Sequence, residues 1–289
     1  MKHTFTVQKP DTLYAFLQNA LPQTTLSFIK AQCKKGETRV NGAKTKQNAP
    51  LAAGDTVEIF LPQNAALPPI KTVFEDDTIL IADKPPHMES ETQLPAVLRK
   101  TRGLQTYAVH RLDVNTTGLL ILAKTTAARD ALIAAFAAGQ VHKTYAARVF
   151  GCPPKPRGEW RGYLAKNART AYCTVTDTPQ KGSREIVTRY EVAAKGEQSL
   201  LWLHPVTGRT HQLRAQTAHA GIPIVGDDKY GNRAKNRAAG AKRQLLRAVA
   251  LRFGTLSGVV KHLSGQTFAV PTGEELLQGA EIKLTYAPE

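Results

Sequence analysis

The sequence predicts an α+β protein with a small N-terminal module and a larger domain built on a mixed sheet. The chain has 289 residues, which is long for one domain. A proline-rich stretch at residues 63–70 reads as a linker. After it, strand and helix patterns interleave without the regular strand–helix repeat of a Rossmann sheet. We therefore divide the chain into residues 1–62, 63–70 and 71–289.

The first module is predicted to contain two helices followed by a hairpin. Apolar residues at helical spacing over residues 13–21, and again between Thr25 and Gly36, indicate the helices. Asn41-Gly42 is typical of a tight turn, and residues 54–60 then alternate as a strand. Four cations on the second helix and the turn after it could contact a phosphate backbone, or could simply form a solvated basic face: Lys30, Lys34, Lys35 and Arg39.

The larger domain is predicted to open with two strands, at residues 72–75 and 78–84, that flank an acidic turn and end at a Pro-Pro loop. The apolar run at 118–124 indicates a buried strand. Residues 126–138 have helical spacing, with Leu132, Ile133 and Phe136 on one face, and the next residues, 143–151, alternate as a strand.

Charge points to a polyanionic partner. The chain has 39 Lys and Arg against 23 Asp and Glu, a net charge of +16, and cations near phosphates gain attraction and release counterions. The longest apolar stretch, at about 131–138, is too short to span a membrane, and the N-terminus lacks a signal-peptide core. Three cysteines without a C-x-x-C pair disfavour disulfides and a zinc ribbon. We expect a cytoplasmic, metal-free, nucleic-acid-associated monomer without a protein partner.

The first candidate for chemistry is the segment HRLDVNTTGLLILAK, residues 110–124. Asp113 follows Arg111 in a loop that leads into the buried strand, where a side chain can be both exposed and fixed. A neighbouring positive charge favours the ionised form of a carboxylate, so Asp113 could be a nucleophile or a base. Alternatively, Arg111 and Asp113 could form a structural ion pair at a turn.

The second candidate is VTGRTHQLRAQTAHAGIPIVGDDKYG, residues 206–231. It gathers Arg209, His211, Arg214 and His219, but their spacing does not settle whether a strand or a helix carries them. The histidines lack a carboxylate or cysteine at a recognisable metal-ligand spacing, so we expect no metal site. Further on, residues 229–252 contain eight Lys or Arg and no acid. This segment is predicted to be either a mobile solvated loop or a flexible arm that binds the RNA backbone.

Residues 1–62 resemble a small αL-type RNA-binding module first seen in a ribosomal protein. The resemblance lies in KKGETRVNG, in LAAGDTVEIF and in the helix pair before them. The usual Arg-Leu-Asp opening is replaced by Asp11-Thr12-Leu13. The resemblance implies that this module binds RNA.

Residues 70–285 resemble the RluA-type RNA pseudouridine synthases. The segments ADKPP, HRLDVNTTGLLILAK, VHKTYAARVFG and VTGRTHQLRAQTAHAGIPIVGDDKYG carry the resemblance in the family's order. It implies a mixed, largely antiparallel sheet and an enzyme that isomerises uridines in structured RNA, ribosomal RNA or transfer RNA, by base flipping and without a cofactor. The alternative is a catalytically inactive RNA-binding or RNA-chaperone protein on the same fold.

The resemblance also implies roles for individual residues. Asp113 corresponds to the aspartate that attacks the target uridine, and Arg214 to the arginine that pairs with it. Tyr145 corresponds to the tyrosine that stacks on the base and helps to remove the proton from carbon 5. Arg111 corresponds to the residue that fills the space left by the flipped nucleotide. Further substrate or RNA contacts are expected from residues in the same motifs: His110, Thr117, Arg209 and His211.

Overall fold

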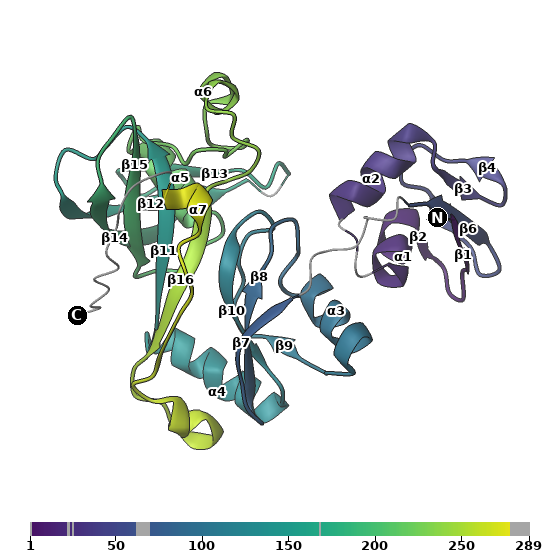
Figure 1. The fold of residues 1–289 in the computed structure, drawn as a ribbon, viewed down its shortest axis with the longest axis horizontal. Helices are drawn as coiled ribbons and strands as arrows, with labels where there is room; N and C mark the ends of the chain where they lie inside the picture. The colour runs from purple at the N-terminus through teal and green to yellow at the C-terminus, as the bar shows by residue number, and fades with distance from the viewer. Residues whose placement is uncertain (1, 22–23, 25, 62–69, 168, 278–289) are drawn as a thin grey trace.

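The computed structural model describes residues 2–21, 24, 26–61, 70–167 and 169–277, which fold into a small N-terminal unit and a larger domain (Figure 1). The predicted linker at 63–70 lies outside the described residues, apart from Ile70. In the small unit, the carbonyl of Thr24 accepts a side-chain hydrogen bond from Gln93 of the larger domain. Among the described helices, none combines the length and the apolar character that crossing a bilayer requires.

The small unit packs two helices on a four-stranded sheet. The helices are α1 (Leu13–Ala20) and α2 (Leu26–Lys35), as predicted. The sheet order is β1 (Lys2–Thr6), β6 (Thr56–Phe60), β3 (Thr38–Val40) and β4 (Ala43–Lys44), and a separate pair is formed by β2 (Asp11–Thr12) and β5 (Pro50–Leu51). The turn at Asn41-Gly42 is confirmed, since both residues have positive φ. Strand β1 was not predicted.

The described part of the larger domain forms an 11-stranded sheet. Its main path runs β13 (Cys173–Thr176), β12 (Arg157–Lys166), β14 (Arg184–Ala194), β15 (Gln198–Pro205), β11 (Val141–Phe150), β16 (Leu246–Phe253), β10 (Thr117–Ala123), β8 (Ile79–Lys84) and β7 (Lys71–Glu75). Two short strands join from the side, β9 (Tyr107–Ala108) on β10 and β17 (Thr267–Ala269) on β16. The mixed, largely antiparallel sheet is confirmed.

One parallel pairing, between β10 and β16, joins the two halves of this sheet. It consists of Thr117 opposite Arg247 and Gly118 opposite Ala248. Gly118 has a φ of 104°, and a Cβ there would lie 2.0 Å from the Ala248 carbonyl oxygen. A side chain at this position would therefore separate the strands. We call this pairing the seam.

Several helices pack on or beside this sheet, with α4 against β10 and α5 against β12 and β13. They are α3 (Gln93–Arg102), α4 (Thr126–Ala137), α5 (Gln212–His219), α6 (Arg233–Ala238), α7 (Glu274–Leu277) and the 3₁₀ helix η1 (Gly258–Leu263). In α4 the expected inward face was partly wrong, because Ile133 is 47% exposed. The buried face consists of Ala128, Leu132 and Ala135, which lie on one side of the helix at spacings of four and three residues. Ile133 is one residue, about 100°, away from that side.

The basic segment 229–252 is folded rather than mobile. Its helix α6 is capped by the Asn232 side chain, which accepts a hydrogen bond from the Lys235 amide. Asn236 is buried, accepts from the Gly226 amide at 2.8 Å and donates to the Asp227 carbonyl at 3.1 Å. The segment is thus attached to the loop that precedes it.

Candidate active site

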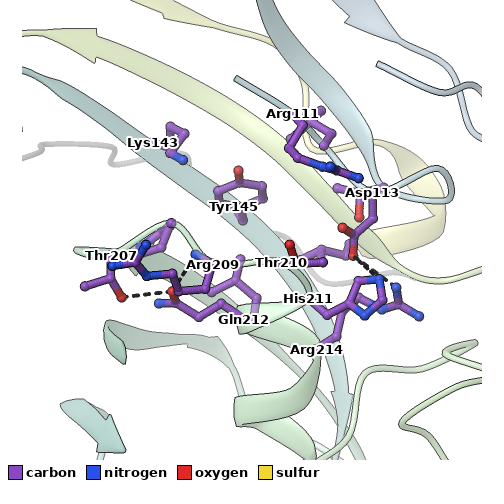
Figure 2. Close-up of a pocket in the computed structure, with 16 residues that line it drawn as sticks. Arg111, Asp113, Lys143, Tyr145, Thr207, Arg209, Thr210, His211, Gln212 and Arg214 are labelled. Carbon is purple, nitrogen blue, oxygen red and sulfur yellow. Dashed lines mark hydrogen bonds and ion pairs between the residues drawn. The ribbon is translucent and has the colours of Figure 1, made fainter. Parts of the chain in front are cut away.

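A pocket opens beside the seam, between the loop that leads into β10, strand β11 and the loop between β15 and α5 (Figure 2). Its lining consists of residues 111–113 and 116, Lys143 and Tyr145 of β11, Pro205, residues 207–214, and Leu246. Asp113, from the first predicted motif, and Arg214, from the last, therefore share one cavity.

Asp113 and Arg214 form an ion pair in this pocket. Arg214 Nη1 donates to Asp113 Oδ2 at 3.0 Å, and the two side chains, of Arg214 and Asp113, are 9% and 16% exposed. Within the described part of the chain, the other carboxylate oxygen, Oδ1, has no hydrogen-bond partner, so it is available to a ligand. Arg214 lies on α5. The spacing had left open whether a strand or a helix carries this residue, and the structure shows a helix.

A second carboxylate, Asp227, fixes the guanidinium of Arg214. Nε and Nη2 of Arg214 donate to the two oxygens of Asp227 at 2.7 and 3.0 Å. Burial acts to lower the pKa of Arg214, but Asp227 and Asp113 outweigh it and hold this pKa above its usual value. Burial acts to raise the pKa of Asp227, and Arg214 outweighs it, so this pKa is lowered. The bidentate pair leaves Nη1 directed at Asp113.

The buried side chain of Lys84 holds the loop that carries Asp113. This lysine is fully buried at the end of β8. Its Nζ donates to the carbonyls of Pro85, Met88 and Val114 at 3.0, 2.9 and 3.1 Å. Burial lowers the pKa of Lys84 to about 7, although the charges of Asp113 and Glu89 oppose the shift. Three acceptors match the three hydrogens of an ammonium group, so Lys84 fixes the residue that follows Asp113.

Tyr145 lies on β11 at an irregularity in the sheet. The pairing with β16 shifts between Thr144 and Tyr145, so that Val249 is an extra residue in β16. Such bulges redirect side chains near active sites. Lys143 and Tyr145, two residues apart, both line the pocket. Burial, and then the charge of Asp113, raise the pKa of Tyr145 well above its usual value, so the phenol is neutral at physiological pH.

The loop before α5 forms the opposite wall and is fixed by Gln212. The Gln212 Oε1 atom accepts from the Thr207 hydroxyl at 2.8 Å and from the Arg209 amide at 3.0 Å. Its Nε2 donates to the Val187 carbonyl at 3.1 Å. The Arg209 side chain remains exposed at the pocket.

The pocket brings together six of the predicted site residues: Arg111, Asp113, Tyr145, Arg209, His211 and Arg214. The suggested ion pair between Arg111 and Asp113 was wrong. Arg111 Nη1 contacts Glu91 at 3.0 Å, with both side chains about half exposed, and Arg214 takes the place beside Asp113. The reason is that Arg111 lies on the solvent side of the loop, whereas α5 approaches Asp113 from the interior.

The other predicted residues do not line this pocket. Thr117 is buried in the seam. His110 packs against Phe136, with ring centroids 4.9 Å apart, and its Nε2 accepts from the Ile121 amide at 3.0 Å. The four cations of the first module lie in the small unit, on α2 and β3: Lys30, Lys34, Lys35 and Arg39.

Several residues that build the pocket were not singled out from the sequence. Asp227 appeared only within the segment of residues 206–231, and Lys84 only within ADKPP. A buried charge needs a partner, but nothing in the spacing connects Asp227 with Arg214. In the part of the chain that the structure describes, no group of three or more His, Cys, Asp or Glu is placed to hold a metal ion.

Comparisons with known proteins identify relatives of this chain. A family described as RNA pseudouridylate synthase matches residues 78–219. Ribosomal large subunit pseudouridine synthase C of Vibrio vulnificus (strain CMCP6) is 33% identical over 272 residues, which cover 82% of this chain and 83% of the relative. The protein of the same name from Escherichia coli (strain K12) is 33% identical over 275 residues, with the same coverage.

Solved structures share the fold. Human RNA Pseudouridylate Synthase Domain Containing 1 superposes with a TM-score of 0.56 at 23% identity, over 76% of this chain and 97% of that one. Human RNA Pseudouridylate Synthase Domain Containing 4 gives a TM-score of 0.59 at 19% identity, over 74% and 94%.

Proposed function

This chain belongs to the RNA pseudouridylate synthase family, and we propose that it isomerises specific uridines of large-subunit ribosomal RNA, with Asp113 as the attacking group. The observation that carries the assignment of Asp113 is its geometry: one carboxylate oxygen is bound to Arg214, while the side chain lines an open pocket together with Tyr145. The relatives named above support ribosomal RNA as the target.

The reaction needs a carboxylate held beside the sugar and base of one nucleotide. The bond from C1′ to N1 breaks and a bond from C1′ to C5 forms, while C5 loses a proton and N1 gains one. Carboxylates attack sugar carbons with oxocarbenium character in retaining glycosidases. Asp113 could attack C1′, or could instead add to C6 of the ring. In both routes Oδ1 is the reacting oxygen, because Arg214 occupies Oδ2.

Tyr145 supplies an aromatic surface for the base. Stacking of a base on an aromatic ring contributes about 1–3 kcal/mol and does not depend on which base is bound. Because the raised pKa of Tyr145 keeps the phenol neutral, its hydroxyl can take the C5 proton only if its own proton is passed on at the same time. A neutral ring also avoids repulsion of the Asp113 carboxylate.

Entry of the nucleotide requires flipping, which costs a few kcal/mol. Arg111 is suited to fill the vacated space, because its ion pair with Glu91 is about half exposed and exposed pairs are worth only about 0–1 kcal/mol. The exposed Arg209 and the partly buried Lys143 provide further positive charge at the pocket for the phosphates.

The test of the proposed function replaces the reacting carboxylate. Asp113→Asn is expected to abolish pseudouridine formation on ribosomal RNA from cells that lack the gene, while RNA affinity changes by no more than a few fold. The amide keeps the size of the side chain, and Arg214 stays paired with Asp227. Pseudouridines would be mapped in this RNA, and in transfer RNA from the same cells, after incubation with each protein.

Two results would contradict the proposal. An active Asp113→Asn variant would remove the attacking group that we assign. If the wild-type protein modified transfer RNA and left ribosomal RNA unmodified, the target would be transfer RNA and the proposed substrate would be wrong.

A further inference from the structure

His211 occupies an unusual place in the pocket. It is the last residue before α5 and has a φ of 56°, in the left-handed region that non-glycine residues rarely adopt. Its side chain is 15% exposed, and Nε2 lies 3.9 Å from Asp113 Oδ2, which is too long for a hydrogen bond. Figure 2 shows the ring on the same side of Asp113 as Arg214.

The other ring nitrogen of His211 is bound to Tyr230. His211 Nδ1 and the Tyr230 hydroxyl oxygen are 2.8 Å apart, and that oxygen accepts a hydrogen bond from the Cys173 amide at 2.9 Å. Burial raises the pKa of Tyr230 above its usual value, so the hydroxyl keeps its hydrogen and needs an acceptor for it.

Nδ1 is the acceptor that the Tyr230 hydroxyl prefers. The competing atom is the sulfur of Cys173, whose own hydrogen is directed at the Thr210 carbonyl at 3.4 Å. A thiol sulfur accepts hydrogen bonds weakly, whereas an unprotonated imidazole nitrogen accepts them well. Tyr230 therefore donates to Nδ1, and a neutral His211 must carry its hydrogen on Nε2.

The surroundings favour this neutral ring. Burial lowers the pKa of His211; Arg214 and Lys229 act in the same direction, while Asp113 and Asp227 oppose them. Within the described residues, no acceptor lies at hydrogen-bond distance from Nε2, although the atom belongs to a residue that lines the pocket. A directed donor thus faces the space beside the reacting carboxylate.

We infer that His211, as a neutral imidazole with its hydrogen on Nε2, donates a hydrogen bond to an oxygen of the ribose or base of the target nucleotide. The inference rests on the proposed function, because it places that nucleotide against Asp113. An uncharged donor can hold the nucleotide next to the Asp113 carboxylate without forming a second ion pair with it. Tyr230 is the positioning residue that sets the proton on Nε2.

The first experiment observes the ring directly. In the full-length protein with ¹⁵N-labelled histidine, the nitrogen resonances of His211 are expected to show a protonated Nε2 and an unprotonated Nδ1. In Tyr230→Phe the preference for this tautomer is expected to weaken. A protonated Nδ1 in the wild-type protein would overturn the inference, whatever the activity of the enzyme.

The second experiment compares two substitutions. His211→Asn tolerates the left-handed backbone and keeps an acceptor for Tyr230, but its side chain is too short to replace Nε2. Its kcat/KM on ribosomal RNA from cells lacking the gene is expected to fall about tenfold or more. His211→Gln, whose amide nitrogen reaches the Nε2 position, is expected to recover part of that loss. Equal activity of His211→Asn and wild type would overturn the inference.

A third experiment identifies the oxygen. Oligoribonucleotides that span the mapped site carry 2′-deoxyuridine, 2-thiouridine or 4-thiouridine at the target. For the analogue that lacks the accepting oxygen, wild type and His211→Asn should react at similar rates, since neither protein can then form the hydrogen bond. If His211→Asn is slower than wild type by the same factor on every analogue as on the unmodified RNA, His211 does not bind these oxygens. A wild-type enzyme that modifies none of the RNAs would instead refute the proposed function and leave the tautomer result standing.

Discussion

At the scale of single residues, the site depends on one guanidinium shared by two carboxylates. Asp227 takes Nε and Nη2 of Arg214, and Asp113 takes Nη1. The difference between the two acids lies in exposure, since Asp227 is 0% and Asp113 16% exposed. The buried acid orients the arginine, and the accessible acid retains a free oxygen for chemistry.

Replacement of the tyrosine hydroxyl separates stacking from proton transfer. Tyr145→Phe keeps the ring, so RNA binding is expected to stay within about twofold, because stacking needs only the aromatic face. If the hydroxyl helps to remove the C5 proton, the rate under single-turnover conditions falls by about 10²-fold or more. An unchanged rate would restrict Tyr145 to stacking.

His110 is expected to make the folded protein sensitive to acid. Burial, and then the charge of Lys143, lower the pKa of His110 well below its usual value, and its Nε2 accepts a hydrogen bond. Below about pH 6.5 the unfolded chain binds a proton that the folded protein does not, so the free energy of unfolding falls by at most about 1.4 kcal/mol per pH unit. Above that pH the contribution is fully present.

Urea unfolding between about pH 5 and pH 7.5 measures this effect. His110→Gln should flatten the acid slope, whereas the same substitution at His142, which is exposed on β11, should not. Equal slopes for wild type and His110→Gln would assign the acid sensitivity to other groups.

The family resemblance implied that Asp113, Tyr145 and Arg214 belong to one site, and all three line one pocket. The motifs could not predict the supports. Lys84 reaches the Val114 carbonyl across 30 residues, and Gln244 reaches the Thr116 hydroxyl across 128. Such contacts depend on the path of the chain in space. The short spacing between Arg111 and Asp113 likewise suggested that these two residues form an ion pair. A local pattern cannot show that α5 brings Arg214 next to Asp113.

At the scale of elements, periodicity located most helices and strands. It failed where the signal was short or displaced. Strand β1 has five residues and only partly buried side chains, and Ile133 lies beside, rather than within, the buried face of α4. In the basic segment, composition suggested mobility, but two buried amides, Asn236 and Gln244, fix it beside the pocket.

Helix α6 presents cations on a rigid support, and we expect them to bind the RNA backbone. Arg233, Lys235 and Arg237 are exposed, while Asn236 holds the helix to Asp227. Their triple replacement by Gln should weaken RNA binding and reduce the slope of log affinity against log salt by roughly 0.7–0.9 for each phosphate that is no longer neutralised. The single-turnover rate at saturating enzyme should be unchanged.

A matched control removes three exposed cations from loops outside the pocket, at Lys155, Lys181 and Lys195. If the α6 variant and this control have the same salt slope, α6 faces solvent in the complex.

At the scale of the whole molecule, the small unit has its own core. Leu13, Leu17, Ile29, Val57 and Ile59 are fully buried within it. The part of the chain that resembles αL-type modules therefore packs around a core of its own. Its lysines on α2 can contact RNA separately from the pocket.

Replacement of Lys30, Lys34 and Lys35 by Gln tests that role. These side chains are exposed on α2, so the fold should be unaffected. RNA affinity is expected to fall by about tenfold at low salt, because fewer counterions are released when fewer phosphates are neutralised. The rate at saturating enzyme should match wild type. Affinity equal to that of the Lys155, Lys181 and Lys195 control would exclude these lysines from the RNA interface.

The seam also determines when, during folding, catalysis becomes possible. Strands β10 and β16 lie about 130 positions apart in the chain, and closure of so long a loop is entropically costly and slow. The hairpin of β7 and β8, which closes a short loop, can form much earlier. Asp113 and Arg214 are themselves 101 positions apart, so we expect a nascent chain that lacks its C-terminal third, and with it Arg214, to be inactive on RNA.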